Sequence, residues 1–234
     1  MNRLDNRVAL ITGASKGIGR ATAEALAKEG VHAVLVARSK DQLTSASKDL
    51  ANLGLKVSIE VADITDPTQA VRVVNSTVSQ FGRLDILVNN AGIGYFKPAI
   101  EMSLKEFDEM WNLNMRAVFV ATKAALPHMI ANKWGAIVNI SSLAGKNSFK
   151  GGTGYCATKW ALRGFASSLM LEVREHNVRV ITIFPGSVDT SFSAMNKRGE
   201  RITQPEDVAS AVVFAVTTPE RSMFSEIDVR PTNP

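Results

Sequence analysis

The chain has 234 residues, of which 45% are hydrophobic and 21% charged, as expected of a globular protein that buries a core. Its formal net charge is +5, but Lys and Arg are scattered and not interleaved with aromatic residues, so we expect no nucleic-acid partner. One cysteine excludes an internal disulfide, and three widely separated histidines show no zinc spacing, so we expect no metal. The first apolar run, Val8–Thr12, is too short for a secretion signal or a membrane span, and we expect a cytoplasmic protein without membrane contact.

Short, β-branched apolar runs alternate with segments of helical periodicity along the whole chain. The strands are expected, in chain order, at Val8–Thr12, His32–Ala37, Val57–Ala62, Leu84–Asn90, Ala136–Ser141, Val178–Phe184 and Glu226–Pro231. Nearly continuous apolar character is typical of strands covered on both faces. The alternation predicts an α/β fold, a Rossmann-type doubly wound parallel sheet with helices on both faces, in a single domain over residues 1–234.

Three of the intervening helices carry recognisable starting signals. Asp66 is expected to cap a helix whose first residue is Pro67. The segments Ser103–Glu106 and Thr203–Glu206 fit the pattern of a capping box, so each is expected to open a further helix.

The segment TGASKGIGR follows the first strand and opens the first helix. It contains Gly13, Gly17 and Gly19, which allow a tight turn and a close approach of the main chain to a pyrophosphate. The following helix N-terminus offers unpaired N–H groups to phosphate. Any strand–helix turn can require glycine, but the position after the first strand predicts a dinucleotide site.

Tyr155 and Lys159 stand four positions apart, so they share a face of the expected helix. Such pairs also occur in ordinary amphipathic helices, and the pair alone does not identify a catalytic site. If Lys159 lies close to Tyr155, its positive charge is expected to lower the phenol pKa from about 10 toward working pH.

Five motifs in one order and spacing extend this interpretation. They are Thr12–Gly19 (T-G-x-x-x-G-x-G), Asn89–Gly92 (N-N-A-G), Ser142 thirteen residues before Tyr155, Tyr155–Lys159 (Y-x-x-x-K), and Pro185–Gly186 with Thr190. Through them the chain resembles the short-chain dehydrogenase/reductase family, in its compact branch, over nearly its whole length. Many members end in a V-D-G-G-like segment, whereas this chain ends in EIDVRPTNP.

The resemblance implies an acid–base centre for the reversible reduction of a carbonyl to an alcohol. Tyr155 would be the general acid and base, Ser142 would orient the carbonyl, and Lys159 would also bind the nicotinamide ribose. Asn114 would help to hold a water in a proton relay. Taken singly, Ser142 could be a strand-end hydroxyl, Lys159 a surface lysine and Asn114 a helix-interior amide. Cys156 is interpreted as a half-buried structural thiol rather than a nucleophile.

The residues after the second strand indicate which nicotinamide cofactor is used. Arg38, followed by Ser39, stands where NAD enzymes usually carry an acid, and a guanidinium suits a 2′-phosphate. Lys16 is a second basic residue, at a position often basic in NADP-using members, and Asp63 resembles the family aspartate near the adenine. NADPH/NADP+ is therefore expected. The expected cofactor contacts are Gly13, Ser15, Lys16, Gly17, Ile18, Gly19, Arg38, Ser39, Asp63, Asn90, Ala91, Gly92, Tyr155, Lys159, Pro185, Gly186, Val188 and Thr190.

The expected activity is that of an NADPH-dependent carbonyl reductase acting on a small-molecule ketone or aldehyde. A 3-oxoacyl-[acyl-carrier-protein] reductase is the alternative, since a basic surface would suit an acidic carrier protein. A catalytically silent cofactor-binding regulator is a further alternative. The resemblance also implies a homotetramer or homodimer. Trp160, after the catalytic lysine, could face the core or a subunit interface.

The substrate-facing segments are expected to be Gly92–Pro98, Ala144–Gly154 and the loop from Ser187 to Thr203. Phe192 and Met195 in that loop are candidate apolar lid residues. These segments do not distinguish among a steroid, a sugar, an acyl thioester and a simple aldehyde.

Overall fold

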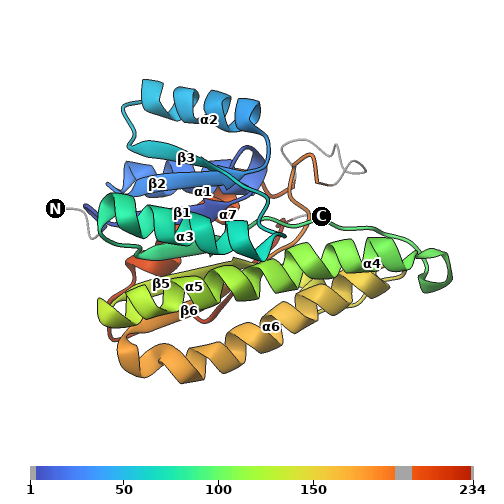
Figure 1. Ribbon diagram of the computed structural model, residues 1–234. Helices are drawn as coiled ribbons and strands as arrows, with labels where there is room; N and C mark the ends of the chain where they lie inside the picture. Colours follow the sequence, from blue (N-terminus) through green and yellow to red (C-terminus); the bar gives the residue numbers. More distant parts are fainter. Residues whose placement is uncertain (1–3, 193–201, 233–234) are drawn as a thin grey trace.

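The computed structural model of the chain describes residues 4–192 and 202–232. Its centre is one seven-stranded sheet in which every neighbouring pair of strands is parallel (Figure 1). The strands are β1 (Val8–Thr12), β2 (His32–Ala37), β3 (Val57–Val61), β4 (Ile86–Asn89), β5 (Gly135–Ile140), β6 (Val178–Pro185) and β7 (Glu226–Val229). Their order, β3-β2-β1-β4-β5-β6-β7, confirms the predicted Rossmann-type doubly wound fold.

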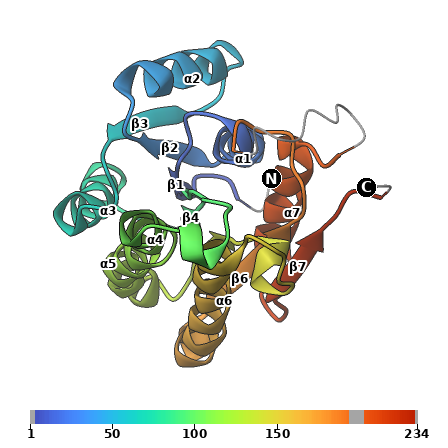
Figure 2. The same cartoon turned by 90° about the vertical axis from the view of Figure 1, so that its right-hand side faces the viewer.

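Helices cover both faces of the sheet (Figure 2). One face carries α1 (Gly17–Lys28), α2 (Lys40–Asn52) and α7 (Pro205–Thr217), and the other carries α3 (Pro67–Phe81), α5 (Ala117–Ala131) and α6 (Thr153–Val173). Helix α4 (Leu104–Trp111) runs into α5 through a π-helical turn, η2 (Asn112–Arg116). The short helical turns are η1 (Ala99–Glu101), η3 (Leu143–Gly145) and η4 (Arg174–His176). Among the described residues, none of the helices has the length and apolar character needed to cross a membrane.

The alternation of side chains along β1 explains the two layers of core. Ala9 and Ile11 pack in the core beneath α1, α2 and α7, whereas Val8 and Leu10 pack beneath α3, α5 and α6. All four are buried because β1 is central and covered on both faces. Successive side chains of a strand point to opposite faces, so such a strand needs a continuous apolar run.

The expectation that every strand is covered on both faces is wrong at the two edges. The residues of β3 are only partly buried, with Val61 exposed, and β7 alternates exposed and partly buried positions. Both strands have a neighbour on one side only, so solvent reaches their outer sides. The bounds of β1 and β2 are as expected, and those of the other strands differ from the expected ones by one or two residues at one or both ends.

Two of the three predicted helix starts are confirmed. The carboxylate of Asp66 accepts a hydrogen bond from the Thr68 N–H at 2.8 Å, and Pro67 is the first residue of α3. Ser103 and Glu106 form the predicted capping box of α4, with the Glu106 N–H donating to the Ser103 hydroxyl at 3.2 Å. Both caps supply acceptors to N–H groups that lack a partner within the helix.

The predicted capping box at Thr203–Glu206 is wrong by one residue. Helix α7 is capped by Gln204, whose N–H donates to the Asp207 carboxylate at 2.8 Å. Thr203 instead forms a parallel bridge with Val188 and is buried at 5% exposure. The bridge draws Thr203 out of the cap position and ties the start of α7 to the segment after β6.

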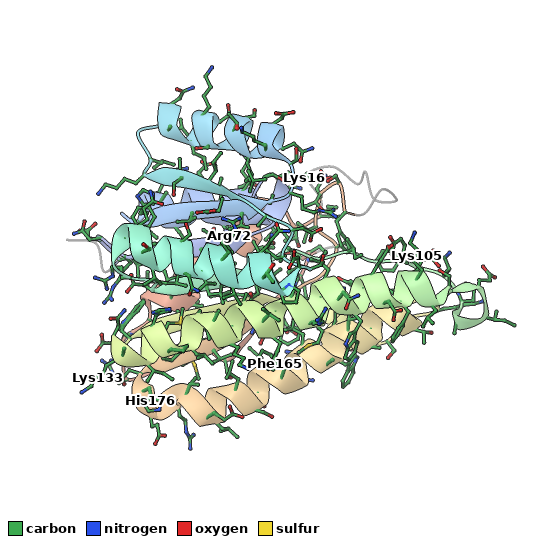
Figure 3. The ribbon with its side chains drawn as sticks, in the orientation of Figure 1. Lys16, Arg72, Lys105, Lys133, Phe165 and His176 are labelled. Atoms are coloured by element: carbon green, nitrogen blue, oxygen red, sulfur yellow. The ribbon has the colours of Figure 1, made fainter. Side chains whose placement is uncertain are left out.

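The carboxyl ends of the strands place the predicted site residues on one edge of the sheet. Gly13, Asn90 and Gly186 directly follow β1, β4 and β6, and Ser142 lies two residues after β5. The strand order reverses between β1 and β4, and this crevice is where doubly wound sheets bind ligands. Figure 3 shows Lys16 at this end of the molecule and Lys133 and His176 at the opposite end.

Candidate active site

The glycine turn after β1 is closely packed against the loop after β4. Gly13 and Gly17 have φ values of +66° and +56°, in the left-handed region that favours glycine. A Cβ on Gly13 would lie 2.9 Å from the Ala91 Cα. A Cβ on Gly19 would overlap the Gly13 carbonyl oxygen and lie 2.5 Å from the Asn90 Nδ2. The turn therefore requires glycine at all three positions, and no side chain at these positions covers its main chain.

Asn90 and Thr12 lock this turn in place. The Asn90 side-chain amide donates to the carbonyl oxygens of Thr12 at 2.8 Å and Gly13 at 3.2 Å. The Thr12 hydroxyl accepts from the N–H groups of Asn90 at 3.0 Å and Ala91 at 3.1 Å. Thr12 is the first residue of the glycine motif, but it is not one of the expected cofactor contacts. Its hydroxyl joins the ends of β1 and β4, the two strands that flank the crevice.

The first turn of α1 is free to receive an anion. Lys16 holds the N-cap position in an extended conformation, and its side chain makes no cap to the helix. The first turn contains no acidic residue, and Lys16 is exposed. The amide groups of this turn, which begins at Gly17, are therefore a fitting partner for a phosphate group.

Arg38 follows β2 and has a largely exposed guanidinium, with 73% of its side chain accessible. Its Nη1 lies 4.0 Å from the Asp63 carboxylate, a separation at which an exposed pair holds weakly. Ser39 caps α2 by accepting from the Gln42 N–H at 3.4 Å, and the Ser15 hydroxyl donates to the Gln42 side chain at 3.3 Å. The glycine turn and the Arg38 segment are thus adjacent, and the guanidinium has donors to offer a phosphate.

The segment after β6 lies against the glycine turn from another side. The Gly186 N–H donates to the Val229 carbonyl at 2.8 Å, which ties this segment to β7. A Cβ on Gly17 would lie 3.4 Å from the Thr190 Cγ2. Val188 is buried at 8% exposure. The structure therefore brings the expected contacts of both segments to one crevice.

Tyr155 and Lys159 lie in the first two turns of α6 and are both buried, at 7% and 5% exposure. The Lys159 ammonium donates to the Ile140 carbonyl at 3.0 Å and lies 5.7 Å from the centre of the Tyr155 ring. A Cβ on Gly92 would lie 3.8 Å from the Lys159 Nζ. Lys159 is therefore not a surface lysine, and its nitrogen reaches the crevice between β4 and β5.

The pKa of Tyr155 does not move in the expected direction. Burial raises it to about 12, Cys156 adds to the rise, and a hydrogen bond with Ser142 opposes it. Burial likewise lowers the pKa of Lys159 to about 8. The expectation that the lysine charge lowers the tyrosine pKa is not met in the protein by itself, where burial of the phenol is the largest influence and raises that pKa.

Ser142 stands just after the end of β5, where it caps the η3 turn. Its hydroxyl oxygen accepts a hydrogen bond from the Ala144 N–H at 3.1 Å. The Ser142 hydroxyl also interacts with the Tyr155 phenol and opposes the rise in its pKa, so the two hydroxyl groups lie near each other. The structure thus joins the serine of the fifth strand with the tyrosine of α6, as the spacing of the two residues predicts.

Asn114 lies in the π-helical turn and is buried at 1% exposure. Its Oδ1 accepts from the Ile93 N–H at 2.9 Å, and its Nδ2 donates to the Ile93 carbonyl at 2.8 Å and the Thr158 hydroxyl at 3.1 Å. Both N–H donors of the amide are therefore used by the protein itself. The insertion that makes a π turn is frequent at functional sites, and here it directs Asn114 toward the loop after β4.

Of the two candidate lid residues, Phe192 lies beside Tyr155. The Phe192 ring centre lies 5.9 Å from that of Tyr155, while Met195 lies outside the described residues. Phe96 also contacts Tyr155, at 5.2 Å between ring centres, and Phe149 contacts Phe96 at 5.9 Å. Phe96 and Phe149 fall within the expected substrate-facing segments, but nothing in those segments singled them out.

The structure also shows the surroundings of Cys156 and Trp160. Cys156 is buried at 7% exposure and packs with Met110 and Ala144, in agreement with a structural thiol. Trp160 is 45% exposed and is therefore excluded from the core. Within residues 4–192 and 202–232, no group of three or more His, Cys, Asp or Glu side chains is placed to hold a metal ion.

Several known proteins are similar to this chain in sequence and in structure. The family model described as short chain dehydrogenase matches residues 7–201. An uncharacterized oxidoreductase of Staphylococcus aureus strain MRSA252 is 35% identical, over 99% of this chain and 100% of its own length. A metagenomic short-chain oxidoreductase solved with NADP is 37% identical, with a TM-score of 0.88 over 97% of this chain and 98% of the other.

An alcohol dehydrogenase from the archaeon Thermococcus sibiricus, solved with 5-hydroxy-NADP, is 33% identical and has a TM-score of 0.91 over 97% of each chain. The family model covers most of the chain, and the matching relatives extend over nearly all of it. The glycine turn and the Ser142, Tyr155 and Lys159 constellation occupy the edge of the sheet at which such a fold binds its ligands. The chain belongs to the short-chain dehydrogenase family of oxidoreductases.

Proposed function

We propose that this protein reduces the carbonyl group of a ketone or aldehyde to an alcohol, reversibly, with NADPH as its cofactor. The observation that carries the proposal is the position of the Tyr155 phenol. It is buried, near enough to the Ser142 hydroxyl for that group to lower its pKa, and 5.7 Å (from its ring centre) from the Lys159 nitrogen, at the edge of the sheet that carries the glycine turn.

The crevice suits NADPH for reasons of shape and charge. The glycine turn and the first amides of α1 would hold the pyrophosphate, and the exposed guanidinium of Arg38 with Lys16 would hold the 2′-phosphate. The NADP in the metagenomic relative and the 5-hydroxy-NADP in the archaeal relative support this assignment. When bound, NADPH supplies the hydride that reaches the carbonyl carbon.

The protein's own residues handle the proton. With its pKa raised to about 12, Tyr155 holds its proton throughout the neutral range and is ready to donate it to the carbonyl oxygen. The Ser142 hydroxyl would orient that oxygen through a hydrogen bond. Lys159 lies close enough for its charge to stabilise the phenolate that remains, and Asn114 fixes the main chain of Ile93 beside it. In the reverse direction the phenolate is the required base, so alcohol oxidation is expected to favour alkaline pH.

The direct test is a panel of carbonyl compounds with NADPH and with NADH. The panel includes a small diketone, an aliphatic aldehyde, an aryl ketone and an acetoacetyl thioester, and the readout is the loss of reduced-cofactor absorbance. We expect turnover of at least one carbonyl with NADPH and much slower turnover with NADH. Tight NADPH binding without oxidation by any of the compounds would favour the cofactor-binding regulator, and equal use of NADH would contradict the cofactor assignment.

The charges near the crevice disfavour the acyl-carrier alternative. Lys97 pairs with Glu106 at 2.6 Å, and Lys146 pairs with Asp228 at 2.7 Å. Both lysines come from substrate-facing segments, and their charges are already balanced within the protein. An acidic carrier protein would find less unpaired positive charge there than the composition indicates. The acetoacetyl thioester in the panel tests this alternative.

We also propose an oligomer interface, on the outer side of α5 and α6. These helices enclose a shallow hollow of about 310 Å³, whose apolar lining includes Phe119, Leu126, Phe165 and Leu169. The rings of Phe119 and Phe165 meet at 6.1 Å, and Figure 3 shows Phe165 between the two helices. We infer that a second copy covers this face, as the family resemblance implies. Sedimentation of the wild type and of Phe119→Glu tests it, with dissociation of the variant as the expected result.

A further inference from the structure

Three phenylalanines from distant parts of the chain converge around Tyr155. Phe96 comes from the loop after β4, Phe149 from the loop before α6, and Phe192 from the segment after β6. The ring centre of Phe96 lies 5.2 Å from that of Tyr155 in an edge-on contact, 5.9 Å from Phe149 and 6.3 Å from Phe192. The three phenyl rings remain 46%, 47% and 44% exposed, respectively. They form one apolar surface that ends at the phenol.

Two glycines lie directly behind these three rings. A Cβ on Gly94 would lie 2.7 Å from the Cζ of Phe96 and 3.1 Å from the Cζ of Phe192. A Cβ on Gly152 would lie 2.7 Å from the Cζ of Phe149. The rings therefore lie directly against bare main chain on one side and are open on the other. A surface that is supported on one side and exposed on the other is suited to receive an apolar group.

The neighbours of Phe96 in the chain fix its position. The Tyr95 hydroxyl donates to the Glu109 carboxylate at 2.5 Å, and the Lys97 ammonium donates to Glu106 at 2.6 Å. Glu106 is in turn held by the capping box at the start of α4. Both flanking side chains are thus fastened to α4, whereas the ring of Phe96 contacts Tyr155. The hydrogen bonds of Tyr95 and Lys97 therefore fix the position of Phe96 together with the packing of its own ring.

We propose that Phe96, Phe149 and Phe192 form an aromatic wall that binds the substituent next to the reacting carbonyl, and that the substrate is a ketone or aldehyde with an aryl or similarly bulky apolar group. This rests on the proposed function. An aryl group can stack on or meet the edges of these rings, and it gains from burial of the exposed phenyl surface. A substrate with a charged or hydroxylated substituent at this position would lose its hydration against the rings without finding a polar partner.

The experiment compares two substrates with the same reacting group. One is the diketone that carries a phenyl and a methyl group, and the other is diacetyl, in which a methyl replaces the phenyl. The wild type with NADPH is expected to favour the phenyl compound in kcat/KM by about tenfold or more. Phe96→Ala should reduce this preference by about tenfold, chiefly through KM, with a smaller loss for diacetyl.

The controls separate recognition from general effects. Phe96→Leu, which keeps an apolar side chain, should recover part of the preference. Phe224→Ala removes a ring of similar exposure, 46%, that packs on Phe214 at 4.9 Å and is not part of the wall, so it should leave the preference unchanged. Equal losses for both diketones in Phe96→Ala would mean that the ring only excludes water or supports Tyr155, and would overturn the proposal.

Failure of the proposed function would be visible separately. If the wild type oxidises NADPH with neither diketone and with no other carbonyl of the panel, the carbonyl reductase assignment fails. Calorimetric titration of the phenyl diketone into the wild type and into Phe96→Ala, each saturated with NADPH, then tests the wall by itself. Binding that weakens about tenfold in the variant supports the aromatic wall, and equal binding or no binding to the wild type contradicts it.

Discussion

The Lys159 nitrogen lies 5.7 Å from the centre of the Tyr155 ring, and both side chains are almost completely buried. Burial raises the pKa of Tyr155 to about 12 and lowers that of Lys159 to about 8. Both changes favour the uncharged forms, since each charge loses hydration in the interior. Tyr155 is thus protonated at neutral pH, and the Lys159 ammonium beside it loses its proton more readily than that of an exposed lysine.

Replacing Tyr155 with Phe is expected to lower kcat for carbonyl reduction by about a thousandfold, because the proton donor is removed while its ring is kept. The NADPH dissociation constant, measured by fluorescence titration, should change far less than kcat. A variant with nearly the activity of the wild type would show that the proton comes from another group.

Lys159→Met is expected to change how the stability of the cofactor-free protein depends on pH. The folded-state pKa of Lys159 is about 8, below the ordinary lysine value of 10.5, so the unfolded chain binds the proton more tightly. Burial of the charged lysine therefore destabilises the folded protein fully below about pH 8, and this destabilisation disappears as the pH rises toward about 10.5. Between about pH 7 and about pH 9.5, the wild type should gain on the order of 2 kcal/mol in the free energy of unfolding that the variant does not gain.

Urea denaturation at several pH values measures this difference. Lys48→Met, which removes an exposed lysine of α2, is the matched control and should keep the pH dependence of the wild type. Tyr155 contributes with the opposite sign, but only above about pH 10, because its folded-state pKa is raised. Parallel curves for the wild type and Lys159→Met would contradict the burial of a discharged lysine.

Arg38→Asp should reverse or abolish the preference for NADPH. The exchange removes a guanidinium and adds a carboxylate that repels the 2′-phosphate and can accept from a ribose hydroxyl. The ratio of kcat/KM for NADPH to that for NADH should fall about a hundredfold or more. Arg174→Asp, an identical charge change at the far end of α6, should leave the ratio intact. An Arg38→Asp enzyme that kept its preference would exclude Arg38 as the phosphate ligand.

Gly19→Ala and Gly164→Ala place the same methyl group in two helices with opposite expected results. At Gly19 the methyl would overlap the Gly13 carbonyl oxygen and approach the Asn90 amide, whereas at Gly164 it would meet nothing within 4 Å. Gly164→Ala should therefore stabilise the protein by about 0.5–1 kcal/mol through helix propensity. Gly19→Ala should destabilise it by about 1–3 kcal/mol and weaken NADPH binding more than about tenfold. Wild-type affinity in Gly19→Ala would show that the turn does not hold the cofactor.

The strands could be predicted from sequence because a central strand of a doubly wound sheet must be apolar on both faces. In Val57–Val61 the polar residues Ser58 and Glu60 alternate with apolar ones, a pattern typical of a strand with one face toward solvent, and this strand lies at an edge of the sheet. The glycine turn was predicted from its position after the first strand, and the Ser142, Tyr155 and Lys159 set from the resemblance to the family; the fold brings both to one edge. Spacing indicates neighbours, but it does not give burial, and for that reason the direction of the Tyr155 pKa was mistaken.

The aromatic wall was beyond the reach of sequence reasoning for a related reason. Phe96 and Phe149 stand in loops among polar residues and glycines, where single exposed aromatic residues are common and need no explanation. Their convergence depends on the tertiary packing of three separate loops. Glycines at positions 94 and 152, which look like ordinary loop residues, gain their meaning only from the rings that lie on them.

Asn114 has a consequence for how such an enzyme can change its substrate. Its amide grips both main-chain groups of Ile93 and the hydroxyl of Thr158, one turn along α6 from Tyr155. The loop that carries Phe96 is thereby attached to α6 through its backbone and not through the Phe96 side chain. An exchange of Phe96 would leave these three hydrogen bonds in place. Under the proposed function, substrate selectivity would therefore change while Asn114 continues to hold this loop beside the helix of Tyr155.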